Sequence, residues 1–169
     1  MTFSIYQASV PVYIRRLQAL SAILDKAAAY ASLRKIDPAA LIQARLYPDM
    51  LPLARQVQIS CSHALRGAAR LTGAEPMNLD DKAGSFDELK ALIAKTLEVL
   101  KSVDAKKMDG AEDRDITFPV GDHKQTMKGG DYLAHFSMPN FYFHVTTAYA
   151  ILRHIGLEIG KDDFIGQAA

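Results

Sequence analysis

Four long stretches of this sequence repeat apolar residues at the three- and four-residue spacing of one helix face, which limits the possible folds sharply. They cover about residues 4–31, 52–71, 86–103 and 131–154. Amphipathic helices of this length bury their apolar stripes by packing against one another. The pattern therefore predicts an all-α four-helix bundle, and residues 1–169 are expected to form a single domain.

Local signals predict how the helices begin and where they are disturbed. Asp37 followed by Pro38 predicts one short extra helix to about residue 45, because aspartate caps a helix and proline suits its first turn. Gly73 is expected to end the second long helix. Pro11 and Pro139 lie inside long helices, where proline removes a backbone donor, so we expect a kink at Pro11 and a bend at Pro139.

Between residues 115 and 127 the apolar period changes from helical to alternating. Ile116 and Phe118 alternate with polar or proline positions, and Gly121-Asp122 supplies a two-residue turn. Pro119 cannot donate to a strand ladder, which confines its strand to an edge. The sequence therefore predicts a small surface β-hairpin before the last helix.

Charge and cysteine content argue against several classes of protein. The chain has 20 Lys and Arg against 19 Asp and Glu, with the signs interleaved, which gives nucleic-acid binding no support. Charges interrupt every apolar stretch before it reaches membrane-spanning length, and no export signal is apparent, so we expect neither a membrane partner nor secretion. A single cysteine, Cys61, favours a cytoplasmic protein, and its place on an apolar helix line favours packing over nucleophilic chemistry.

The last helix carries two polar residues where apolar ones are expected. At about 100° per residue, His144 points in nearly the same direction as Ile151 and Ile155, with Asn140 one turn before it. We therefore expect His144 in the middle of the apolar stripe. A buried imidazole or amide without a partner costs about 1–3 kcal/mol, so both side chains are expected to find partners in the core. Those partners could make a structural hydrogen-bonded pair or a ligand-binding or catalytic site.

The second long helix contains a line of polar and small residues beside its apolar stripe. Its members follow one another at steps of four, three and four residues: Gln56, Ser60, His63 and Gly67. Such a line can face a cavity inside the bundle, or it can be the helix margin that meets solvent. In the first case, the predicted ligand pocket consists of Gln56, Ser60, His63, Asn140 and His144.

A metal site has weaker support from the residues alone. His135 and His144 lie about 180° apart around the last helix, so they cannot share one ion. Asparagine is a weak ligand for a transition metal, and the inner face of this helix carries no carboxylate. We therefore expect no cofactor. The common nucleotide-binding, hydrolase and zinc-protease motifs are absent from the sequence.

Several segments together resemble an uncharacterised bacterial branch, a domain of unknown function, within the DinB-like superfamily. The resemblance covers nearly the whole chain and includes Arg45-Leu-Tyr-Pro-Asp-Met50, Pro52-Leu-Ala-Arg-Gln-Val-Gln58, Gly110-Ala-Glu-Asp-Arg114 and Asn140-Phe-Tyr-Phe-His144. DinB-like proteins are four-helix bundles and are often dimeric. Many hold a divalent metal with one histidine from the second helix and two from the last, and some transfer low-molecular-weight thiols.

The resemblance implies a degenerate form of that metal site. His144 matches the final ligand, Asn140 takes the place of the histidine one turn earlier, and Gln56 is the best match in the second helix. The leading interpretation is a homodimer with a polar core pocket that binds a small ligand or is purely structural. The alternative is a metal-dependent enzyme such as a thiol S-transferase, in which His144 ligates Zn²⁺ or Ni²⁺ and His63 helps to complete the coordination.

Overall fold

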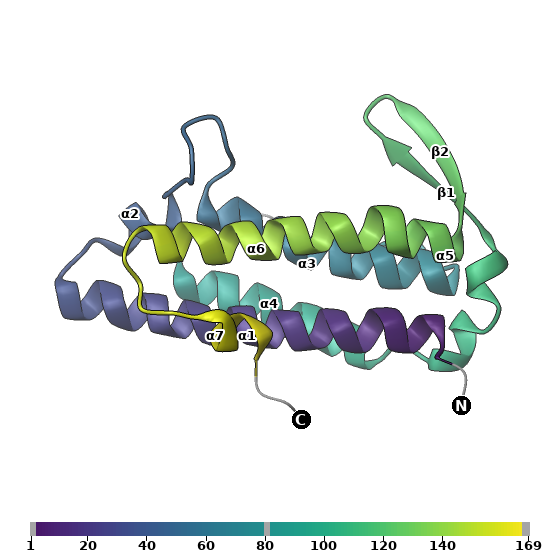
Figure 1. The fold of residues 1–169 in the computed structure, drawn as a ribbon, viewed down its shortest axis with the longest axis horizontal. Helices are drawn as coiled ribbons and strands as arrows, with labels where there is room; N and C mark the ends of the chain where they lie inside the picture. The colour runs from purple at the N-terminus through teal and green to yellow at the C-terminus, as the bar shows by residue number, and fades with distance from the viewer. Residues whose placement is uncertain (1–2, 80–81, 167–169) are drawn as a thin grey trace.

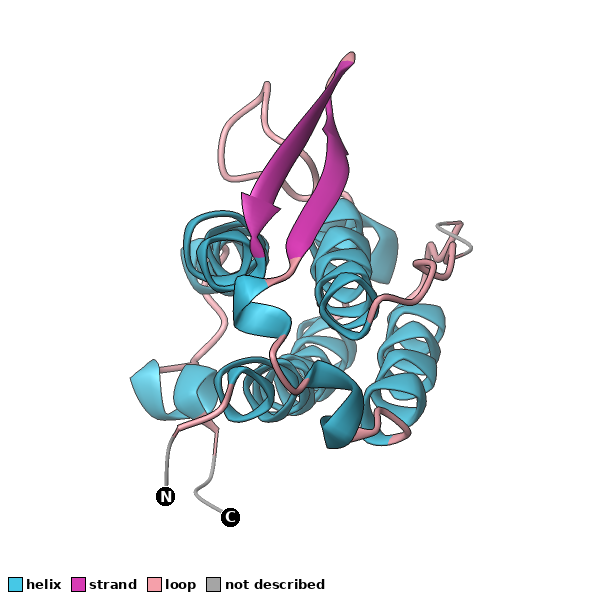
Figure 2. Cartoon of the chain, turned by 90° about the vertical axis from the view of Figure 1, so that its right-hand side faces the viewer, coloured by secondary structure: helices cyan, strands magenta, loops and turns pink. Residues whose placement is uncertain are grey.

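The structure is a computed structural model that describes residues 3–79 and 82–166, and it confirms the four-helix bundle (Figure 1). The long helices are α1 (Ile5–Arg34), α3 (Leu53–Thr72), α4 (Phe86–Lys101) and α6 (Met138–His154). Helix α3 packs against both α6 and α4, and α1 packs against α4. Viewed end-on, the helices form two layers, with the hairpin projecting from one of them (Figure 2).

Most of the predicted helix ends are confirmed. Gly73 adopts a left-handed conformation and caps α3, and α1 runs through Pro11 as one continuous helix. Helix α2 (Pro38–Ile42) is capped by Asp37 as predicted, but it ends earlier than residue 45. The carbonyl of Ala44 accepts a hydrogen bond from the backbone N–H of Leu53, so the chain turns toward α3 instead of extending α2.

The predicted hairpin is confirmed in position and register. Strands β1 (Asp115–Val120) and β2 (His123–Lys128) are antiparallel and joined by a two-residue turn, and two short 3₁₀ turns, η1 (Ala105–Met108) and η2 (Ala111–Asp113), connect α4 to them. Ile116 and Phe118 are buried, whereas Pro119 is exposed. The ring of Phe118 packs against Phe136 at 4.4 Å between centroids, so the base of the hairpin is anchored to the last helical stretch.

The last helical stretch contains an irregularity that the sequence did not reveal. Helix α5 (Gly129–Tyr132) is followed by a π-helical turn, η3 (Leu133–Ser137), and only then by α6. Pro139 lacks a backbone N–H and its ring crowds the carbonyl four residues earlier, and a wider turn is one way to relieve both problems. The amide of Asn140 donates to the carbonyl of Phe136 at 2.7 Å, which satisfies one of the carbonyls of that turn.

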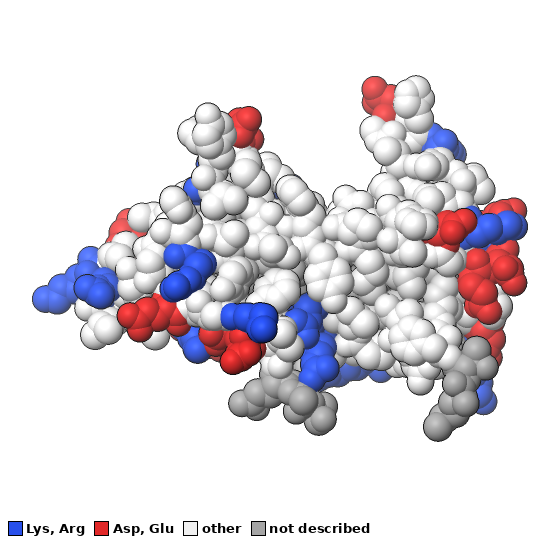
Figure 3. Space-filling view, in the orientation of Figure 1, with Lys and Arg blue, Asp and Glu red and all other residues white. Residues whose placement is uncertain are grey.

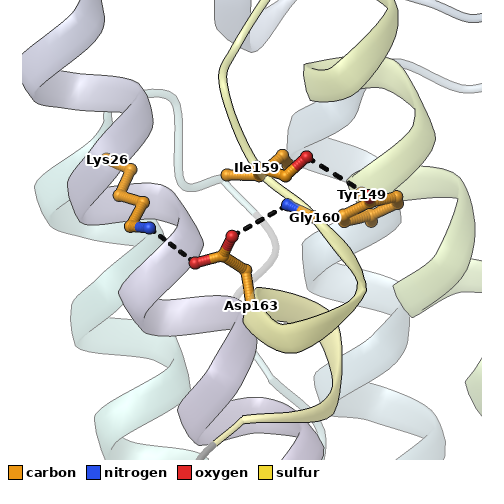
Figure 4. Close-up of polar contacts among 5 residues, drawn as sticks. All are labelled: Lys26, Tyr149, Ile159, Gly160 and Asp163. Carbon is orange, nitrogen blue, oxygen red and sulfur yellow. Dashed lines mark hydrogen bonds and ion pairs between the residues drawn. The ribbon is translucent and has the colours of Figure 1, made fainter.

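A C-terminal segment that was not predicted returns along α1. After α6 ends, the chain forms α7 (Lys161–Ile165), which packs on α1. Asp163 accepts a hydrogen bond from the N–H of Gly160 at 2.8 Å and pairs with Lys26 at 2.6 Å (Figure 4). The buried guanidinium of Arg16 also donates to the carbonyl of Phe164, at 2.6 Å. These contacts attach the C-terminal segment to the first helix.

Charges of both signs are mixed on the molecular surface. On the face shown in Figure 3, acidic and basic side chains gather near both ends and along one edge, around a broad uncharged area. Within residues 3–79 and 82–166, none of the helices is long and apolar enough to cross a membrane.

Candidate functional site

Gln56 and His144 meet where α3 and α6 pack together. The Gln56 side chain is buried, and the His144 side chain is half-buried. Nδ1 of His144 lies 2.7 Å from Oε1 of Gln56. The amide nitrogen of Gln56 in turn donates to the carbonyl of Leu51 at 3.1 Å. A chain of hydrogen bonds therefore links the backbone before α3 to the imidazole on α6.

This chain of hydrogen bonds determines the tautomer of His144. The carbonyl of Leu51 can only accept, so it must face the NH₂ group of Gln56, and Oε1 of Gln56 must face His144. An amide oxygen also only accepts, which requires the imidazole proton on Nδ1. Burial lowers the pKa of His144, which favours the neutral ring at pH 7. In the neutral ring, Nε2 carries a lone pair that can accept a hydrogen bond or a proton.

His63 on α3 stacks against His144. The two ring centroids lie 5.6 Å apart with an angle of 16° between the ring planes. Burial is the main cause that lowers the pKa of His63 to about 4, and electrostatic repulsion from protonated His144, Arg66 and Arg70 adds to it. Both imidazoles are therefore neutral near pH 7, and His63 resists protonation more strongly than an ordinary histidine does.

The lowered pKa of His63 predicts a loss of stability in mild acid. The unfolded chain binds a proton at His63 near pH 6.5, whereas the folded protein does so only near pH 4. The full contribution of neutral His63 to the free energy of unfolding is therefore present above about pH 6.5 and is lost as the pH falls to 4. The free energy of unfolding should decrease by up to about 3 kcal/mol across this window. Urea titrations at several pH values measure it.

The variant His63→Gln provides the comparison for that pH dependence. Glutamine does not titrate, so the stability of the variant should depend less on pH between 6.5 and 4 than that of the wild-type protein. Parallel pH profiles for the two proteins would contradict the assignment of this effect to His63.

The sequence predicts His144 in the middle of the apolar stripe, and in the structure it lies off the centre of that stripe. The buried residues of α6 are Phe141, Val145, Thr147, Ala148, Ile151 and Leu152. At about 100° per residue, the centre of this set lies about 40° from His144. Ile155, on which the prediction also relied, stands at the C-terminal cap of α6 and is only half-buried. His144 is therefore half-buried beside the stripe centre, and one ring nitrogen bonds to Gln56.

Two of the predicted pocket residues, Ser60 and Asn140, bond to the backbone of their own helical stretches. The hydroxyl of Ser60 donates to the carbonyl of Gln56 at 2.8 Å, and the Asn140 amide is engaged with Phe136. Ser60 and Gly67 are buried, as Gln56 is, so the polar line on α3 is not a margin that meets solvent. The contacts thus join Gln56, His63 and His144, whereas a pocket that also includes Ser60 and Asn140 stays a prediction.

Cys61 lies on α3 but turns into the apolar core. It is fully buried, and this burial raises its pKa to about 12. The side chain is therefore a neutral thiol at pH 7, and thiols are poor nucleophiles compared with thiolates. This agrees with the packing role expected from the sequence.

The donor groups at this site do not fit a three-ligand metal centre. Catalytic zinc sites usually use three protein ligands drawn from His, Asp, Glu and Cys. Here two imidazoles and one amide come together, and no cluster of three such side chains able to hold a metal occurs in the described parts of the chain.

A cleft of about 600 Å³ opens beside His63, between α3 and strand β1. Three arginines line it: Arg66, Arg70 and Arg114. None of these three arginines was predicted as a site residue from the sequence. Arg66 and Arg70 follow His63 at three- and four-residue steps, a helical spacing that could have indicated a shared face. Arg114 comes from a distant segment, so the three arginines come together only in the folded chain.

Comparisons with known proteins agree with this architecture. Residues 5–165 match a family model described as Domain of unknown function (DUF1993). The chain is also similar to the crystal structure of a DinB family member protein from Shewanella denitrificans, with a TM-score of 0.91 and 38% sequence identity. That match covers 97% of this chain and 93% of the other. No curated protein matches the chain.

Proposed function

This chain belongs to the DUF1993 family of DinB-like domains, and we propose that it binds a small ligand that donates a hydrogen bond to Nε2 of His144. The observation that carries the proposal is the bond between Nδ1 of His144 and the oriented amide of Gln56. It leaves Nε2 as an acceptor, and within the described residues no hydrogen bond uses that nitrogen. A half-buried neutral imidazole held in this way is prepared to accept an O–H, N–H or S–H group.

The binding test uses the full chain and ligand-observed NMR with a set of small alcohols, amides and thiols. The proposal expects a compound whose binding shifts the His144 ring signals and is lost in His144→Phe. The matched control is His135→Phe, because His135 is exposed and near the start of the same helical stretch. Binding that survives in His144→Phe, or the absence of any shift at His144, would contradict the proposal.

The hydrogen bond between Gln56 and His144 should also affect stability, whether or not the pair binds a ligand. Gln56→Leu alone leaves Nδ1 of His144 without its acceptor and should lower the free energy of unfolding by about 1–2 kcal/mol. In the double variant Gln56→Leu/His144→Leu both polar partners are gone, so we expect it to be about 1 kcal/mol more stable than additivity implies. Urea denaturation of Gln56→Leu, His144→Leu and the double variant measures the coupling. Additive losses would show that the two side chains are not coupled.

A metal-dependent enzyme such as a thiol S-transferase is the second candidate. One observation favours it: metal-binding histidines commonly hold one ring N–H on a carbonyl or carboxylate, and His144 does so with Gln56. Metal analysis of protein purified without a histidine tag, after addition of Zn²⁺ or Ni²⁺, separates the candidates. Stoichiometric metal that is lost in His144→Ala would support the enzyme, whereas the ligand-binding proposal expects less than one ion in ten chains.

We also propose that the protein is a homodimer, as its DinB-like fold suggests. Tyr142 and Phe143 are exposed on α6 and offer aromatic surface to a second copy. Size-exclusion chromatography with light scattering should give twice the chain mass of 18.6 kDa. A mass equal to that of one chain would contradict the proposal.

A further inference from the structure

The cleft beside His63 brings together more positive charge than its own carboxylates neutralise. Besides the three arginines, it is lined by Glu75 and Asp115. Asp115 forms an ion pair with Lys128 at 2.7 Å, so its charge is already balanced. Glu75 is exposed and belongs to the segment that follows α3. Among the described residues, three arginines therefore line the cleft together with two carboxylates, one of which already pairs with Lys128.

Two of these guanidinium groups are held in place without a carboxylate. Nη1 of Arg70 donates to the hydroxyl of Tyr132 at 3.1 Å, and the guanidinium lies 5.2 Å from the ring centroid of Phe118. Nη1 of Arg114 donates to the carbonyl of Leu71 at 3.0 Å. Each guanidinium has five N–H donors, and these contacts use few of them. The remaining donors are available to a ligand at little cost in side-chain entropy.

Arg66 is the third guanidinium of the cleft. It is exposed, and it forms no hydrogen bond or ion pair with the rest of residues 3–79 and 82–166. Apart from its charge, it contributes little to the fold. It lies one turn before Arg70 on α3, so both guanidinium groups can approach the same anion.

Apolar groups also line the cleft: Ile116 and Pro119 of β1 and Phe136. A ligand that fits both the arginines and these groups combines an anionic group with an apolar body. A phosphate monoester carries a charge near −2 at pH 7 and three oxygens that match guanidinium forks.

We propose that this cleft binds a phosphate monoester with an apolar or aromatic body. The phosphate contacts Arg66, Arg70 and Arg114, and the body packs against Phe136 and the β1 side chains. The cleft adjoins the candidate site through His63, which stacks on His144, but the proposed phosphate contacts do not use Nε2 of His144.

The experiment is a calorimetric titration of the full chain with phenyl phosphate at pH 7 and low salt. We expect saturable binding of one molecule per chain that weakens as salt is added. Arg66→Gln should weaken binding about fivefold or more, because it removes a charge-assisted contact. The variant should fold normally, since Arg66 is exposed and makes no hydrogen bond or ion pair within the described parts of the chain. Lys161→Gln on α7 makes the same change of charge far from the cleft and should leave the affinity unchanged.

Further ligands separate the parts of the proposal. Inorganic phosphate lacks the apolar body, phenol lacks the charge and benzoate carries a single charge, so each should bind at least about tenfold more weakly than phenyl phosphate. Equal loss of affinity in Arg66→Gln and Lys161→Gln, or the absence of saturation, would overturn the proposal.

Discussion

Replacing Gly129 with alanine is expected to lower the free energy of unfolding by about 3 kcal/mol or more. Gly129 is buried at the junction of β2 and α5, where a Cβ atom would lie 1.8 Å from the carbonyl oxygen of Ala111. The obstructing atom belongs to the backbone, so no side-chain rotation can relieve the overlap. The N–H of Gly129 also donates to the carbonyl of Arg114 at 2.9 Å, which fixes the backbone in this place.

The neighbouring glycine provides a matched control for that substitution. A Cβ atom at Gly130 would meet only the carbonyl oxygen and Cβ of Glu112, at 3.6 and 3.8 Å, which is ordinary contact. Gly130→Ala should therefore change the free energy of unfolding by less than about 1 kcal/mol. Urea denaturation of both variants measures the difference. Similar losses in the two variants would contradict the close approach at Gly129.

Gly67→Ala is expected to lower the free energy of unfolding by about 2–3 kcal/mol. The hydroxyls of Tyr13 and Ser137 form a buried hydrogen bond of 2.7 Å, and a Cβ atom at Gly67 would lie 2.5 and 2.6 Å from them. The ring of Tyr13 is fully buried and packs against Phe141 at 4.9 Å, so it has little room to move. Glycine at this position allows α3 to approach that hydrogen-bonded pair.

A second variant tests whether the Tyr13 hydroxyl is the obstacle. Tyr13→Phe removes the hydroxyl and should cost about 1 kcal/mol by itself, because Ser137 loses its partner. In the double variant Gly67→Ala/Tyr13→Phe, the closest overlap is gone. We therefore expect the combined loss to be smaller than the sum by about 1 kcal/mol. Additive losses in thermal or urea denaturation would show that the strain arises elsewhere.

The bundle could be predicted because its signals are local in the sequence. Apolar spacing locates the long helices, and the alternation around Ile116 and Phe118 locates the hairpin. Helix α7 was missed because it is only five residues long and is attached to α1 by Lys26 and Arg16, which are distant in sequence. Contacts between distant segments leave no periodic pattern in the sequence.

The candidate site was predicted in part, for a related reason. A contact between Gln56 and His144 could be expected because both are polar residues close to the apolar stripes of their helices. The structure contains this contact. The partner of Asn140 depends on the π-helical turn before Pro139, which widens the helix and leaves a carbonyl within reach. A uniform angle of about 100° per residue does not represent that turn. The arginines of the cleft come from separate segments, so their proximity required the fold.

The central claim is that Gln56 holds the imidazole proton of His144 on Nδ1 and leaves Nε2 as the acceptor. Long-range ¹⁵N–¹H correlation spectra at pH 7, with the His144 signals assigned from His144→Gln, report the tautomer directly. We predict a protonated Nδ1 and an unprotonated Nε2 in the wild-type protein, and a loss of this preference in Gln56→Met. A proton on Nε2 in the wild-type protein, with Nδ1 unprotonated, would contradict the claim.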